Sequence, residues 1–216
     1  MKLADEIERA QEAMIPNIPA EALSAMMAAT EKLVESGIAD KAKKRGEQAP
    51  EFTLKNVKGE EISSAALLRE GPLVISFYRG AWCPYCNLEL KALDNVTGEI
   101  KKLGANLIAV SPNLREKSSQ LVAENPFSFE ILSDEGSRVA EQFGLVFTLA
   151  EELRPIYKGF GIDLIEYDGN DSFTLPIPAT YVIGRDGIIV HSFVDADYTK
   201  RMEPDEIVEA LGKLKG

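Results

Sequence analysis

Short apolar runs and segments with one apolar face alternate along the middle of this chain of 216 residues. The apolar run at 73–78 predicts a strand that is buried on both faces, and further strands are predicted at 106–111 and 129–132. The segments at 84–103, 114–124 and 137–143 carry apolar residues at helical spacing and predict helices. Strands that alternate with helices in this way are typical of a parallel sheet with crossover helices.

Further strands are predicted on either side of this unit. Residues 49–62 predict a short hairpin, which a helix at 63–69 follows. Near the C-terminus, Asp186-Gly187 separates apolar runs at 179–184 and 188–194, a strong signal for an antiparallel hairpin, and a last helix is predicted at 204–214. We therefore expect an α/β fold with a central mixed sheet of four or five strands and helices on both faces.

Two segments do not fit the alternation. Residues 1–45 predict two amphipathic helices, which the sequence Ile15-Pro16-Asn17-Ile18-Pro19 separates. This N-terminal helical extension could cover either its own domain or a second subunit of a homo-oligomer. Residues 144 to about 175 are rich in polar and aromatic side chains and predict an insertion in the domain 46–216. A lid or an interface element is the role expected for this insertion.

Composition and charge narrow the function classes. A hydrophobic content of 45% is enough for one core, and 24 basic against 35 acidic residues give a net charge of −11. Such an acidic protein is not expected to bind nucleic acid or anionic membrane surfaces. No apolar stretch approaches the roughly 20 residues that span a bilayer, and the first residues lack a signal-peptide pattern. A soluble cytoplasmic protein is therefore expected.

The chemistry is concentrated at Cys83 and Cys86, the two cysteines of the chain. They lie where a buried strand leads into a helix, so the helix amides and macrodipole favour a thiolate at Cys83, and Cys86 is close enough to attack a mixed disulfide. Two inert core cysteines are one alternative. A zinc site is another, but it needs four ligands and His191, expected to be an ordinary strand residue, is the one other soft candidate. We therefore expect a redox pair without a metal or another cofactor.

The segment Trp82-Cys83-Pro84-Tyr85-Cys86 after a buried strand resembles the thioredoxin superfamily. Far downstream, Ile177-Pro178 directly precedes a strand of the terminal hairpin, as a cis-proline does in that superfamily. The resemblance implies a thioredoxin-like fold in which a cis Pro178 packs beside the cysteines. A trans proline at the strand edge is the alternative, and the neighbouring Pro176 competes for the same assignment.

Within this superfamily, residues 46–214 resemble the peroxiredoxins of the alkyl hydroperoxide reductase and thiol-specific antioxidant group. The likeness rests on the segments 46–54, 77–78, 110–111 and 179–183, and residues 77–86 resemble a bacterial peroxiredoxin-like subgroup with a CPYC motif. Three elements that activate peroxide in that family differ here. Arg79 stands in place of a proline, Cys83 in place of a threonine and Pro178 in place of an arginine, while Cys86 occupies the peroxidatic position.

The order of the two thiols stays open. The local residues favour Cys83 as an exposed nucleophile and Cys86 as the resolving thiol, whereas the alignment with peroxiredoxins favours the reverse. Arg79 is the candidate for stabilising the thiolate, with a solvated surface arginine as the alternative, and Trp82 either shields the sulfurs or simply packs. Pro84-Tyr85 also occurs between the cysteines of many glutaredoxins, and this resemblance suggests glutathione as a reductant.

A polar cluster of Asp195, Asp197, Tyr198 and Arg201 follows the last predicted strand. We interpret it as the loop before the final helix, held by aspartate caps and an arginine pair. Its spacing indicates no carboxylate dyad.

Three hypotheses for the function follow. The resemblance implies a thiol-dependent peroxidase that reduces hydroperoxides and is recycled through a Cys83–Cys86 disulfide by thioredoxin or glutathione. The local residues favour a thiol-disulfide oxidoreductase with little peroxidase activity, since disulfide exchange needs only a low-pKa thiolate, a second thiol and an accepting surface. The third is a non-catalytic redox sensor or adaptor, whose disulfide alters how the N-terminal helices or the insertion bind a partner.

Overall fold

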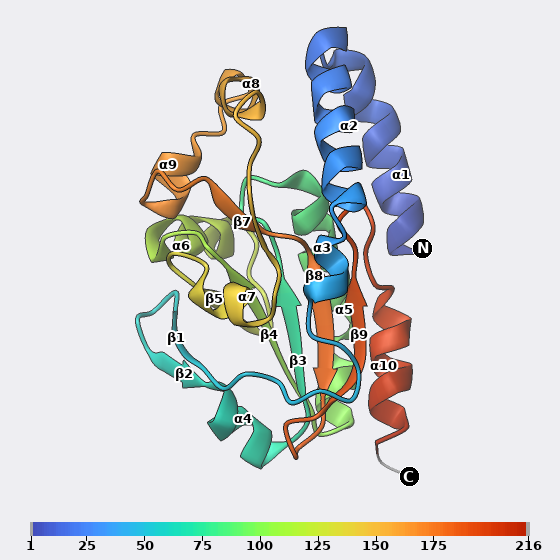
Figure 1. Cartoon of the computed structure of the whole chain (residues 1–216). Coiled ribbons are helices and arrows are strands. Elements are labelled where there is room, and N and C mark those ends of the chain that lie inside the picture. The colour runs from blue at the N-terminus through green and yellow to red at the C-terminus, as the bar shows by residue number, and fades with distance from the viewer. Residues whose placement is uncertain (1, 215–216) are drawn as a thin grey trace.

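A mixed sheet forms the centre of the molecule (Figure 1). The computed structural model describes residues 2–214, so Met1 of the predicted extension and residues 215–216 of the predicted domain lie outside the described part. Within it, seven strands follow the order β2-β1-β5-β4-β3-β8-β9. Their bounds are β1 Thr53–Asn56, β2 Glu61–Ser63, β3 Leu73–Phe77, β4 Asn106–Ser111, β5 Glu130–Ser133, β8 Ala179–Ile183 and β9 Ile189–Val194.

The middle of the sheet is parallel and its edges are antiparallel. β3 pairs in parallel with β4, and β4 with β5, as expected for strands joined by crossover helices. β8 runs antiparallel to β3, and β9 continues β8 as the predicted hairpin. The predicted mixed α/β sheet is confirmed. It has seven strands within residues 2–214, rather than four or five, because the hairpin β1–β2 joins the sheet antiparallel to β5.

Helices cover both faces of the sheet. Along β3, Val74 faces the cluster with α5 and α10, whereas Leu73, Ile75 and Phe77 face the opposite core, as the alternation of a strand requires. Within the described residues, no helix is long and apolar enough to cross a membrane. The helices after the extension are α4 Ser64–Glu70, α5 Pro84–Lys102, α6 Arg115–Glu124, α7 Arg138–Gln142, α8 Leu153–Gly159, α9 Leu164–Asp168 and α10 Pro204–Gly212.

The segment 144–175 contains ordered elements of its own. β6 (Val146–Thr148) and β7 (Thr174–Pro176) form a two-stranded antiparallel sheet, and α8 and α9 lie between them in the chain. Leu149, Leu153 and Tyr157 belong to a separate apolar cluster there. This segment therefore has a small apolar core of its own.

The N-terminal helices pack against the rest of the chain (Figure 1). They comprise α1 (Leu3–Met14), a 3-10 turn η1 (Ile15–Asn17), α2 (Ala20–Glu35) and α3 (Ile38–Lys41). α1 contacts α5 and buries Leu3 and Ile7, and its first amides donate hydrogen bonds to the Glu203 carboxylate at 3.0 and 2.9 Å. α2 contacts α8, with Met26 against the apolar cluster of the segment 144–175. These helices were expected to cover either their own domain or a second subunit, and here they cover their own chain.

Candidate active site at the cysteine pair

A tight loop between β3 and α5 presents the cysteines. The backbone of Gly80 has φ +148°, and a Cβ there would lie 2.5 Å from Trp82 Nε1 and 2.8 Å from Asn113 Nδ2. Asn113 Oδ1 accepts a hydrogen bond from the Ala81 amide at 2.7 Å, which ties the loop to the segment after β4. Cys83 then occupies the N-cap of α5 in an extended conformation. Gly80 and Asn113 thus fix where the first sulfur meets the helix.

Both thiols are free and buried. Cys83 is 1% exposed and Cys86 is 0% exposed. The expectation of an exposed Cys83 is therefore wrong, because Trp82 and Tyr85, both half-buried, pack against the cluster that contains the two cysteines. Pro84, in the first turn of α5, is exposed. Trp82 and Tyr85 thus cover the sulfurs that Pro84 separates in the sequence.

The electrostatic surroundings make the two thiols unequal. Burial acts to raise the pKa of Cys83, but the hydrogen bond from Cys86 and the charges of Arg79 and Arg201 outweigh it and lower this pKa to about 6. Burial, reinforced by the interaction with Cys83, raises the pKa of Cys86 well above its ordinary value. The pair therefore loses its first proton from Cys83, and Cys86 stays a thiol that can donate to the thiolate.

Arg201 links Cys86 to a buried carboxylate. Its Nη2 donates to Cys86 Sγ at 3.3 Å, and its Nε donates to Glu89 Oε2 at 2.6 Å, with side chains 2% and 1% exposed. The other oxygen of Glu89 accepts from Ser76 at 3.3 Å and from Thr180 at 3.2 Å. Burial raises the pKa of Glu89, and the charge of Arg201 opposes that rise. The ion pair with Glu89 therefore holds the Arg201 guanidinium against the Cys86 sulfur in a buried site.

Arg79 lies on the other side of the cysteine loop and is 3% exposed, so the alternative of a solvated arginine is excluded. Its Nη2 donates to the Tyr157 hydroxyl at 2.6 Å. Its guanidinium carbon lies 4.3 Å from the ring centre of Tyr198 and 4.9 Å from that of Trp82, distances typical of cation–π contacts. The buried guanidinium of Arg79 is therefore stabilised by the rings of Trp82 and Tyr198, whereas a buried cation is usually paired with a carboxylate.

Pro178 is buried and directly precedes β8. No peptide bond within residues 2–214 is cis, so the prediction of a cis bond before Pro178 is wrong. Pro176 ends β7 and Ala179 begins β8, so the chain runs on nearly extended, and a trans proline fits at the start of a strand. Because Ala179 pairs with Phe77, Pro178 lies beside the point where the chain leaves β3 toward the cysteines.

The polar cluster after β9 is arranged differently from its interpretation. Asp195 and Asp197 each accept a hydrogen bond from the amide two residues further on, and neither caps α10, which begins after Glu203. Arg201 pairs with Glu89 on α5 instead of an aspartate. The predicted aspartate caps and their arginine pair are therefore wrong, because the arginine side chain turns inward to the sulfur and each aspartate closes a short turn of its own loop.

The sequence reasoning overlooked Glu89 and Tyr157. Glu89 follows Cys86 by three residues on the buried face of α5, and an acid among core leucines was a signal that could have been found. Tyr157 lies in the insertion, where no periodicity points to a site. His191 lies in β9, with Nε2 4.0 Å from Glu206 Oε2. Among residues 2–214, no group of three or more histidine, cysteine or acidic side chains could hold a metal ion.

The model of the AhpC/TSA family matches residues 45–192. The chain belongs to the AhpC/TSA family. This membership agrees with the resemblance inferred from residues 46–214.

Two proteins of similar sequence and one solved structure of similar fold can be compared with this AhpC/TSA chain. The putative peroxiredoxin bcp of Haemophilus influenzae is 35% identical over 100 residues, which are 46% of this chain and 64% of that protein. The thiol-disulfide oxidoreductase ResA of Halalkalibacterium halodurans is 36% identical over 101 residues, 46% of this chain and 56% of that protein. The crystal structure of peroxidoxin BcpB from Mycobacterium tuberculosis gives a TM-score of 0.63 at 21% identity, over 80% of this chain and 99% of that one. The first of these matches spans just under two thirds of its relative, and the structural match establishes the fold alone.

Proposed function

We propose that this AhpC/TSA protein is a thiol-dependent peroxidase that reduces hydroperoxides through Cys83 and Cys86. The observation that carries the proposal is a buried pair of free thiols with Arg201 Nη2 3.3 Å from Cys86 Sγ, in which the pKa of Cys83 is lowered to about 6 and that of Cys86 is raised. A thiolate at neutral pH beside a protonated thiol is the combination that attack and resolution require. Arg79 and Arg201 supply the positive charge that a leaving oxygen needs.

In the first step the Cys83 thiolate attacks one oxygen of the peroxide, the O–O bond breaks, and the leaving alkoxide takes up a proton to become the alcohol. Cys83 is then a sulfenic acid, oxidised by two electrons. The Cys86 thiol attacks this sulfur, a disulfide forms and water leaves. Two thiols of thioredoxin, or two molecules of glutathione, return the pair to its reduced form.

Access to the sulfurs is part of the proposal. Cys83 and Cys86 are 1% and 0% exposed, so a substrate reaches them only when the cover moves. Trp82 and Tyr85 are the half-buried members of that cover. We expect their side chains to shift during turnover, together with the first turn of α5.

The second candidate is a thiol-disulfide oxidoreductase with little peroxidase activity. The observation in its favour is that Cys83 stands where peroxiredoxins have a threonine, so the hydroxyl that would orient a peroxide is replaced by a second thiol. The name of the relative from Halalkalibacterium halodurans describes that activity for that protein. Arg201 beside Cys86 weighs the other way, because it supplies a guanidinium that the sequence pattern had lacked.

A stopped-flow experiment separates the two candidates. Trp82, the single tryptophan, lies next to Cys83 and reports oxidation by its fluorescence. Reduced protein is mixed with stoichiometric hydrogen peroxide or cumene hydroperoxide, and separately with oxidised glutathione. Rapid oxidation by peroxide supports the peroxidase, and oxidation by the disulfide alone supports the oxidoreductase. Slow oxidation by both reagents, with partner binding that follows the redox state, would favour the sensor.

Single cysteine variants test which sulfur reacts first. In Cys86→Ser protein we expect peroxide to leave a sulfenic acid at Cys83 that a dimedone probe traps. In Cys83→Ser protein we expect little adduct at Cys86, whose pKa is raised. The opposite pattern would reverse the roles of the two cysteines.

A further inference from the structure

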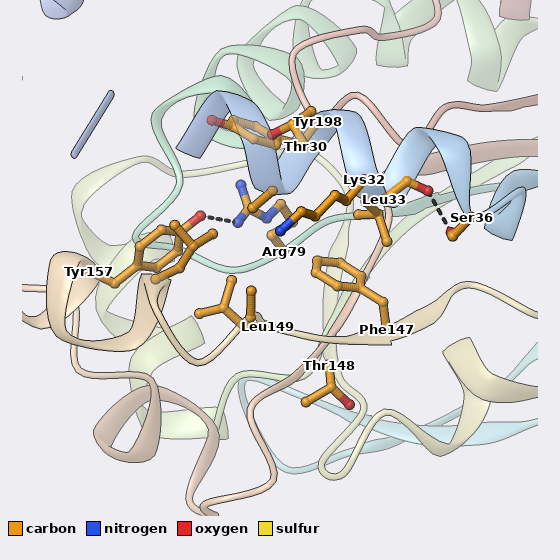
Figure 2. A pocket seen from close by; sticks show the side chains of 13 residues that line it. Thr30, Lys32, Leu33, Ser36, Arg79, Phe147, Thr148, Leu149, Tyr157 and Tyr198 are labelled. Atoms are coloured by element: carbon orange, nitrogen blue, oxygen red, sulfur yellow. Dashed lines mark hydrogen bonds between the residues drawn. The ribbon is translucent and has the colours of Figure 1, made fainter. Parts of the chain in front are cut away.

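A cavity of about 230 Å³ lies between α2 and the β6–α8 segment, with Arg79 at its inner wall (Figure 2). Its apolar lining comes from two distant parts of the chain, with Leu33 from α2 and Phe147, Leu149 and Leu153 from the insertion. An apolar cavity of about 150 Å³ is large enough for a benzene ring. The space therefore suits an organic molecule of about ten non-hydrogen atoms.

The charge of this cavity is unlike that of the protein. Its lining includes Arg79 and Lys32 but no aspartate or glutamate, although the chain has a net charge of −11. Figure 2 shows the Lys32 side chain extending along the cavity in the direction of Arg79. The buried Arg79 and the exposed Lys32, beside apolar side chains, favour a ligand with one negative charge and an apolar body.

Arg79 has donors to spare. The guanidinium is buried, its Nη2 bonds to Tyr157, and its Nε has no partner among the described residues. No carboxylate of the described part of the chain forms an ion pair with it. A buried cation without a carboxylate is costly, and a planar guanidinium binds a carboxylate through paired hydrogen bonds. Arg79 is thus a cation at the cavity wall that is balanced by aromatic rings and the Cys83 thiolate and not by a carboxylate, and a carboxylate in the cavity would add a further anion to it.

We propose that this cavity binds a monocarboxylate with an apolar body of about six to ten carbons, held by Arg79 at its inner wall and by the apolar side chains of α2 and the insertion. The proposal concerns a binding site and does not depend on peroxidase activity. Because the charge of Arg79 also acts on Cys83, a bound carboxylate offsets it and makes the thiolate less favourable. By linkage, the ligand binds more tightly to the thiol form than to the thiolate form.

Calorimetric titration of the reduced full-length protein with octanoate, and with octanamide as its neutral counterpart, tests the proposal. We expect saturable binding of octanoate and at least tenfold weaker binding of octanamide, because only the anion forms charge-assisted hydrogen bonds. Equal affinities, or no saturable binding of octanoate below about 10 mM, would overturn the proposal, since that limit corresponds to less than 3 kcal/mol of binding free energy. This comparison uses the unaltered protein and decides the matter even if a variant does not fold.

Variants locate the site. Arg79→Gln is expected to remove the preference for octanoate over octanamide, whereas Arg185→Gln, at the β8–β9 turn and outside the cavity lining, keeps it. Ala29→Phe fills the cavity from α2, a helix without a fully buried residue, and is expected to weaken both ligands. Unchanged binding in Ala29→Phe would place the ligand elsewhere and refute the assignment.

A second readout tests the link to the thiol. The ultraviolet absorbance of the thiolate is titrated with and without saturating octanoate, and the apparent pKa of Cys83 is expected to rise in its presence. A pKa that stays unchanged while octanoate is bound would show that the carboxylate does not contact Arg79. Neither measurement uses a peroxide, so a protein that fails as a peroxidase can still pass both.

Discussion

Removing the Cys86 thiol should raise the pKa of its partner by a calculable amount. In the native site, Cys86 donates to the Cys83 sulfur, and this hydrogen bond is the largest of the interactions that lower the pKa of Cys83 to about 6. A hydrogen bond to a charged group contributes about 1.5–3 kcal/mol, and each pKa unit corresponds to about 1.4 kcal/mol. Cys86→Ala should therefore raise the pKa of Cys83 by about one to two units, to roughly 7–8.

The assay is the ultraviolet absorbance of the thiolate as a function of pH, with a Cys83→Ala/Cys86→Ala double variant as the baseline. Native protein should give a first step near pH 6, which belongs to Cys83. Cys86→Ala should give one step at the raised pKa. In Cys83→Ala, the pKa of Cys86 should fall from its native value, because the neighbouring thiolate is gone and Arg201 still donates to the sulfur.

Two results would refute this reasoning. A Cys83 pKa that stays near 6 in Cys86→Ala would show that the arginines alone stabilise the thiolate. A first native step that vanishes in Cys86→Ala, while Cys83→Ala still titrates near pH 6, would show that Cys86 carries the thiolate.

Three further predictions concern stability, measured by urea unfolding. Arg201→Met should lower the free energy of unfolding by about 3–5 kcal/mol, because it leaves the buried Glu89 without its partner. Adding Glu89→Leu should recover most of this loss. A loss below about 1 kcal/mol in Arg201→Met would contradict the prediction, since that is the value expected of an exposed ion pair. The depressed pKa of Cys83 adds stability that is fully present above its unfolded pKa near 8.5 and is lost as the pH falls through 6. Between these pH values, native protein should therefore lose about 2–3 kcal/mol more stability than Cys83→Ser, in which every other group titrates as before. An equal change in the two proteins would contradict this. Burial raises the pKa of Asp168, which accepts a hydrogen bond from Asn113 at 2.7 Å, to about 7. The free energy of unfolding should therefore fall as the pH rises from about 4 through 7. Asp168→Asn should remove this pH dependence, and a variant less stable than the native protein at pH 8 would exclude this explanation.

Most of the secondary structure could be predicted because its signal is local. The predicted helix at 84–103 is found as Pro84–Lys102, and the predicted strand at 106–111 is found as Asn106–Ser111. The strand number was underestimated, since whether the hairpin near residue 53 joins a sheet depends on an edge of β5 that is far away in the sequence. Local periodicity carries no information about such an edge.

The candidate site divides in the same way. The motif identified Cys83 and Cys86, and the position after the strand suggested Arg79. The sequence did not reveal that both sulfurs are buried, or that Arg201 bonds to Glu89 across 112 positions. It also suggested a cis bond at Pro178, which the described residues do not contain.

The sequence by itself determined the order of helices and strands, the family resemblance and the position of two thiols at a strand–helix junction, because each depends on neighbouring residues. Tertiary structure decided which thiol is acidic. That difference arises from burial and from two arginines, one preceding the motif and one more than a hundred residues after it. Charge acts through space rather than along the chain, so only the folded arrangement makes Cys83 a thiolate and keeps Cys86 protonated.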